Sequence, residues 1–182
     1  MIPLNCCAVV GFLRTIGIIN AAVWFGSLIF FTTAVGPAFF SDEMIRLIPP
    51  PYNGVAAQIL LKRYFYVQMW CAGIALAHLS AEWLYSRRPI QRFTLLLLMC
   101  LFLCGILGGY VFLPNMKELH VKMYHPQTTA EVKAASKRSF WILHGTSSAM
   151  NLLVICGVLV YLWHVTKPVN TARFTSVNRF TV

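Results

Sequence analysis

The feature that most constrains this chain is a run of twenty-one residues without a charged side chain, from Phe93 to Leu113. A helix of about 20 apolar residues crosses the hydrocarbon core of a bilayer. Every backbone polar group in that core must be satisfied within its own segment, so an α-helix is expected. Three other segments are also predominantly apolar and long enough to cross. The sequence therefore predicts four membrane spans, at about 10–36, 64–85, 93–113 and 140–163.

The composition agrees with a membrane protein and excludes other classes. Apolar residues make up 58% of the chain and charged residues 11%, against about 45–50% and about 25% in soluble domains. Disorder is excluded by the same values. The formal net charge is +10, but the basic residues cluster just outside the apolar runs, where they anchor in anionic headgroups. The expected partner is therefore the lipid bilayer and not a nucleic acid.

These spans predict an all-α membrane protein, a four-transmembrane-helix bundle formed by residues 1–166. The remaining residues, 167–182, form a basic C-terminal tail. Charge is nearly balanced between the two membrane sides. Three arginines in one short turn favour that side as cytoplasmic, together with both termini, in a cell inner or plasma membrane. The three are Arg87, Arg88 and Arg92.

Spans three and four are expected to continue beyond the bilayer as a helical hairpin. After Pro114, helical spacing resumes, with Glu118 and Lys122 as an i,i+4 pair. The turn is predicted near His125-Pro126.

Thr128 and Glu131 have the spacing of a capping box. This pattern predicts that the next helix opens there and continues into the fourth span.

Polar side chains inside lipid are costly and form the list of candidate functional residues. On the fourth span, polar residues recur at i, i+3, i+4 and i+7, which is one helix face. Such a polar stripe either bonds neighbouring helices together or lines a pocket. It consists of His144, Ser147, Ser148 and Asn151.

Three residues from other parts of the chain accompany the polar stripe. Asn20 and Asn151 are both expected deep in the bilayer, which makes them a candidate interhelical pair. If the stripe lines a pocket, His144 is expected at its mouth, near Arg63 and Tyr64.

A second cluster is expected at the opposite membrane face, where Arg14, His78 and Glu82 come close. Glu82 either pairs with Arg14 or orients His78. Alternatively, Arg14 and Glu82 reach the headgroups by extending along the helix surface.

Small residues on the third span indicate close helix packing. Gly105 and Gly109 form a G-x-x-x-G motif, and Pro114 follows as a kink. Packing within one chain is expected.

Several segments together resemble the transmembrane protein 205-like family over about residues 8–165. They are WFGSLIFFTTAVGPAFF (24–40), VAAQILLKRYFYV (55–67), VFLPNMKEL (111–119) and FWILHGTSSAMNLL (140–153). The resemblance implies a four-span protein without an established catalytic mechanism. It also implies membrane handling of metals or small solutes, since the human namesake is associated with resistance to platinum drugs.

A weaker, architectural likeness is to copper-resistance-D-like proteins, in which histidines can bind haem. Bis-histidine ligation of haem needs two imidazoles that face each other at one depth, and His78 with His164 is the pair that fits the predicted topology.

No catalytic motif accompanies these segments. We therefore expect a protein that is not an enzyme and has no resident metal or cofactor. It would act as a small-solute- or metal-handling membrane protein, or as an accessory subunit of a larger membrane complex, with homo-oligomerisation an open alternative. The alternative function is a haem- or copper-binding membrane redox protein.

Overall fold

The computed structural model describes residues 4–86 and 91–167. Arg87, Arg88 and nearly all of the predicted basic tail therefore lie outside the described residues. Every regular element in the described part is helical. The all-α prediction is confirmed at this level.

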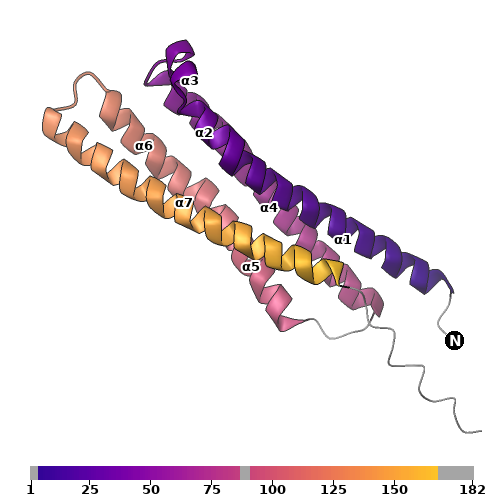
Figure 1. Ribbon diagram of the computed structural model, residues 1–182. Coiled ribbons are helices and arrows are strands. Elements are labelled where there is room, and N and C mark those ends of the chain that lie inside the picture. Colours follow the sequence, from indigo (N-terminus) through magenta and orange to yellow (C-terminus); the bar gives the residue numbers. More distant parts are fainter. Residues whose placement is uncertain (1–3, 87–90, 168–182) are drawn as a thin grey trace, which may run out of the picture.

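The helices follow one another with short connections, as Figure 1 shows. Two of the continuous rods contain a wide, π-helical turn, labelled η. The elements are α1 (Leu4–Phe30), η1 (Phe31–Val35), α2 (Gly36–Phe39), α3 (Asp42–Leu47), α4 (Tyr52–Ser86), α5 (Arg92–Leu107), η2 (Gly108–Phe112), α6 (Leu113–Tyr124) and α7 (Ala130–Thr166).

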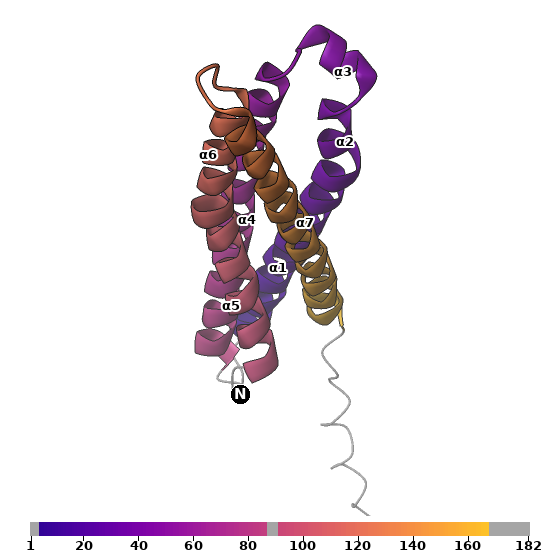
Figure 2. The ribbon, with the colours of Figure 1, turned by 90° about the vertical axis from the view of Figure 1, so that its left-hand side faces the viewer.

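The long rods pack lengthwise against one another. The main contacts join α1 with α4 and α7, α4 with α5, and α6 with α7. The start of α1 and the end of α7 lie at one end of the molecule, and α3 and the α6–α7 turn lie at the other (Figure 2). Trp24, Leu28, Leu98, Val158 and Tyr161 are the largest fully buried side chains and form the centre of the core.

Three helical rods of the described part are long and apolar enough to cross a membrane: Gly11–Phe39, Arg92–Tyr124 and Ala130–Thr166. They contain the predicted spans 10–36 (from Gly11), 93–113 and 140–163. Helix α4, which holds the predicted span 64–85, is not among them. It carries amides such as Gln58 and Gln68, which are buried against its neighbours and lower its apolar character. The fourth span stays a prediction.

Both wide turns end two residues before a proline. In η1 the N–H of Gly36 donates to the carbonyl of Phe31, five residues back, and Pro37 follows. In η2 the N–H of Leu113 donates to Gly108 in the same way, before Pro114. Proline has no N–H and its ring clashes with the carbonyl four residues earlier. A wide turn lets the helix continue through this obstacle.

The α6–α7 connection lies where the sequence predicts it. Helix α6 ends at Tyr124, His125 is its C-cap, and α7 begins at Ala130. The Glu118–Lys122 pair is confirmed, with 2.6 Å between Oε1 and Nζ. Both side chains are exposed, so the pair contributes little stability.

The predicted capping box at Thr128 is wrong. The N-cap of α7 is Thr129, and its side chain makes no capping bond. Thr128 belongs instead to the preceding turn, where its N–H donates to the carbonyl of His125 at 3.3 Å. This turn moves the start of α7 one residue beyond the predicted position.

Candidate functional site

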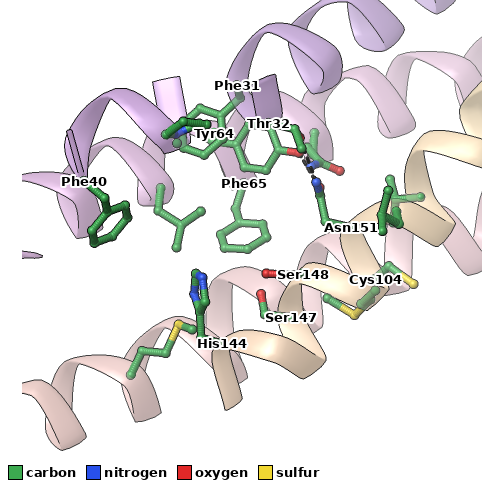
Figure 3. A pocket seen from close by; sticks show the side chains of 18 residues that line it. Phe31, Thr32, Phe40, Tyr64, Phe65, Cys104, His144, Ser147, Ser148 and Asn151 are labelled. Carbon is green, nitrogen blue, oxygen red and sulfur yellow. Dashed lines mark hydrogen bonds between the residues drawn. The ribbon is translucent and has the colours of Figure 1, made fainter. Parts of the chain in front are cut away.

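The polar stripe of α7 faces a cavity of about 410 Å³, which we call the lower cavity. Figure 3 shows it from close by. Opposite α7, its wall includes Phe31 and Thr32 of η1 and Tyr64 and Phe65 of α4. All four predicted stripe residues line it. The face predicted from helical spacing is thus the face that the cavity exposes.

Asn151 joins three helical rods at this cavity. The phenol of Tyr64 donates to its Oδ1 at 2.5 Å, and its Nδ2 donates to Oγ1 of Thr32 at 2.9 Å. The ring of Tyr64 stacks on Phe31, with centroids 4.1 Å apart and an angle of 17°. Hydrogen bonds between helices are the function expected of an amide inside lipid. Asn151 therefore contributes to helix packing as well as to the cavity wall.

His144 lies at the other end of the stripe and is held by aromatic rings. Phe140 is parallel to its imidazole, at a centroid distance of 6.2 Å and an angle of 2°. Trp141 stands nearly perpendicular to it at 5.8 Å. Between His144 and Asn151, the hydroxyls of Ser147 and Ser148 point toward the cavity (Figure 3). The stripe thus combines a packing residue with three residues that face the cavity.

A second cavity of about 440 Å³, the upper cavity, adjoins the first. The two share wall residues from η1, α4, α6 and α7, among them Phe31, Leu61, Met116 and His144. The two cavities therefore lie next to each other along α7.

The upper cavity is bounded by η1, α2, α3 and α6, by the first turns of α4, and by α7 from Lys137 to His144. His120 of α6 and Lys137 of α7 line it. The Nε2 atom of His120 lies where a Cβ at Gly54 would be. Glycine at position 54 therefore allows α6 to approach α4 at this point.

Two residues predicted beside the stripe lie elsewhere. Asn20 is buried, and its Nδ2 donates to the carbonyl of Cys71 at 2.9 Å. The predicted Asn20–Asn151 pair is therefore replaced by separate partners for the two amides. Arg63 is exposed and is not part of the cavity wall that the structure describes, whereas its neighbour Tyr64 is part of it.

Arg14 and His78 of the second predicted cluster have well-defined surroundings. The Arg14 guanidinium donates to the carbonyls of Thr166 and Lys167, at 3.1 and 2.9 Å. It thereby ties α1 to the end of α7. The His78 ring packs on Gly17, where a Cβ would lie 2.7 Å from Cε1.

The Nε2 atom of His78 is buried and has no hydrogen-bond partner in the described part of the chain. Glu82 lies one helical turn beyond His78 and is exposed. The Arg14–Glu82 pair stays a prediction.

The glycines of α5 and η2 lie against α4 of the same chain. Gly105 faces Met69, and Gly109 faces Phe65, each with 3.4 Å to an added Cβ. The closest approach is at Gly108, where the ring of Phe65 occupies the space of a Cβ. Gly108 and Phe65 were not on the list of candidate residues.

Thr32 was also not among the predicted residues. Its signal is its position five residues before Pro37, inside the wide turn that the proline favours. A threonine there looks like an ordinary helix residue, because its hydroxyl also donates to the carbonyl of Leu28 at 2.7 Å.

Residues 19–125 match the model of a family described as a domain of unknown function, DUF4149. This range holds the second part of α1, from residue 19, and all of α4, α5 and α6. It does not include α7, which carries the polar stripe. No curated protein and no solved structure matches the chain.

Proposed function

The chain belongs to the DUF4149 family, whose function is unknown, and we propose that it binds a small solute inside a membrane-embedded helical bundle. We also propose that the protein is not an enzyme and has no resident cofactor. The sequence segments described above further indicate a relationship to the transmembrane protein 205-like family, which we include as a proposal.

The observation that carries this proposal is the lower cavity itself. Its volume of about 410 Å³ lies within the range of small-molecule sites, roughly 300–1,000 Å³. Mostly apolar walls with a few convergent polar groups are typical of such sites. Here the polar groups are His144, Ser147 and Ser148. A protein that used the stripe only for packing would have no need of a space beside it.

The membrane arrangement that we propose has four spans, with α4 as the additional one. Helix α4 packs between α1 and α5, two rods that are apolar enough to cross a membrane. A helix that packs along both of these rods would cross the bilayer beside them. The α6–α7 ends would then extend beyond the bilayer as a hairpin, and both termini would be cytoplasmic.

The experiment is native mass spectrometry of the protein extracted in mild detergent, with its absorbance spectrum measured on the same sample. We expect a small molecule to leave with the wild-type protein. The variant Ser147→Phe, which places a ring in the lower cavity, should lose that molecule. Thr146→Phe is the matched control, because Thr146 is exposed on the same helix and does not line the cavity.

The same measurement distinguishes solute binding from the role of an accessory subunit. A particle that retains a second polypeptide and no small molecule would support an accessory subunit and contradict solute binding. Equal retention of the molecule by wild type and Ser147→Phe would also contradict the proposal.

One observation favours the haem- or copper-binding alternative. His120 and His144 come from different helices and both line the upper cavity. The ring of Phe140 lies 6.5 Å from His120 and 6.2 Å from His144. A Soret band in the extracted sample that is lost in His144→Ala would establish this alternative in place of the first proposal.

A further inference from the structure

The two adjoining cavities, taken together, make an elongated space whose ends differ in chemistry. It follows α7 from Lys137 to Val154, which is about 25 Å at 1.5 Å per residue. An acyl chain in one leaflet spans about 15 Å, half of the hydrocarbon core. The space is therefore long enough for one lipid-like chain laid along the helix.

The lower end offers such a chain a mostly apolar environment, in which Ser147 and Ser148 add two hydroxyls. The polar atoms of Asn151, Tyr64 and Thr32 bond to one another there. Aromatic rings, among them Phe31 and Phe65, make up much of the remaining wall. A charged ligand group at this depth would have no ionised partner among the described lining residues, and an unpaired buried charge is very costly.

The upper end offers a single positive charge. Lys137 is the one Lys or Arg among the described residues that line either cavity, and no Asp or Glu is among them. It lies three residues before the proposed fourth span, at the depth of the headgroups. An ammonium in this place balances one negative charge and extends its methylene stem along apolar surface.

We propose that the space binds a long-chain fatty acid, with its carboxylate at Lys137 and its chain directed along α7 toward Asn151. This inference rests on the proposed function and names the class of its solute. One acyl chain fits the cavity volumes of about 410 and 440 Å³. The orientation matches that of a lipid in the same leaflet, with the head at the interface and the chain in the core.

The test measures binding of palmitate to the full-length protein in detergent by titration calorimetry. We expect palmitate to bind and its uncharged methyl ester to bind about tenfold more weakly, the range for loss of a bond to a charged group. Lys137→Gln should weaken palmitate binding by a similar factor and leave the ester unchanged. Lys137 is exposed, so this variant is expected to fold normally, which its melting temperature checks.

Lys133→Gln is the matched control, since Lys133 lies one turn earlier on α7 and is not among the described lining residues. It should bind palmitate like the wild type. Equal binding of palmitate and ester, or unchanged binding by Lys137→Gln, would overturn the headgroup assignment. Tighter binding of lysophosphatidylglycerol than of palmitate would overturn the fatty acid as the ligand.

The outcome for the solute class is separable from the outcome for the proposed function. If palmitate fails to bind while Ser147→Phe still expels a co-purifying molecule, the fatty acid is wrong and the solute site stands. If neither palmitate nor any co-purifying molecule depends on the cavity, both proposals are wrong.

Discussion

The phenol of Tyr64 donates a 2.5 Å hydrogen bond to Oδ1 of Asn151, although the two residues are 87 positions apart in the chain. The same amide donates to Thr32 through Nδ2. One side chain thereby connects α1–η1, α4 and α7 at the wall of the lower cavity. Its removal has a measurable consequence.

Replacing Asn151 by Ala should destabilise the protein more than replacing Tyr64 by Phe. The first variant removes two interhelical bonds and the second removes one, and such bonds contribute roughly 0.6–2 kcal/mol each. The measurement is the free energy of unfolding from a denaturant titration in mixed micelles. A double-mutant cycle of the two changes should give a coupling energy of about 0.6–1.7 kcal/mol.

Asn115→Ala is the matched control, because Asn115 is exposed and its Nδ2 donates within its own rod, to the carbonyl of Val111. It should change stability by less than Asn151→Ala. A coupling energy near zero for Tyr64 and Asn151 would contradict the bridge between α4 and α7.

Gly108→Ala should destabilise the protein by about 1–3 kcal/mol, the usual range for overpacking a tight contact. The added Cβ would fall on the ring of Phe65, so α4 and η2 would have to separate. Thermal unfolding followed by circular dichroism measures the loss. Restoring space with Phe65→Leu in the Gly108→Ala background should recover part of it.

Gly26→Ala is the control for the intrinsic effect of alanine in a helix. Nothing lies within 4 Å of a Cβ at position 26, so this change should be neutral or slightly stabilising. If Gly108→Ala behaved like Gly26→Ala, the close packing of α4 on η2 would be wrong.

The fold could be predicted largely from hydropathy, because the bilayer permits few alternatives to the helix. The run from Phe93 to Leu113 is long and uncharged, and it is found as one continuous helical rod. Helix α4 shows the limit of this argument. Its tyrosine, glutamine and histidine side chains are accommodated by neighbouring helices. A hydropathy value is assigned to each residue without regard to its neighbours, so it does not take this packing into account.

The site could be predicted only in part, because helical spacing identifies a face and not the partners of that face. Spacing placed His144 and Asn151 on one side of α7. The partner Thr32 depends on the wide turn η1, and a wide turn rotates the following residues relative to a regular helix. The expected pair of Asn20 and Asn151 does not form, because Asn20 bonds to a backbone carbonyl. Helical spacing does not indicate a backbone carbonyl as the partner of a side chain.

Position 70 tests whether α4 crosses the bilayer. Trp70 lies within the predicted span 64–85 and is 73% exposed, so in a four-span arrangement it faces lipid. In a background with the native cysteines replaced by alanine, Trp70→Cys in intact membranes should not react with a water-soluble maleimide, because thiolate formation requires water. It should react once the membranes are dissolved in a denaturing detergent.

Val121→Cys provides the comparison on the proposed extramembrane hairpin. Val121 is 61% exposed on α6 and should be labelled without detergent once both membrane sides are accessible. Equal labelling rates at positions 70 and 121 in intact membranes would show that α4 does not cross the bilayer.

The α6–α7 hairpin should protect its own basic residues from trypsin. Lys122 lies in the last turns of α6, and Lys133 lies in the first turn of α7. Proteases need an extended backbone, so cleavage at either site requires local unfolding of a helix end that packs on its neighbour. We expect slower cleavage at both sites in membranes than in a synthetic peptide of residues 117–138, followed by mass spectrometry. Cleavage as fast as in the peptide would mean that the connection is open, and that α6 and α7 do not continue as packed helices beyond the bilayer.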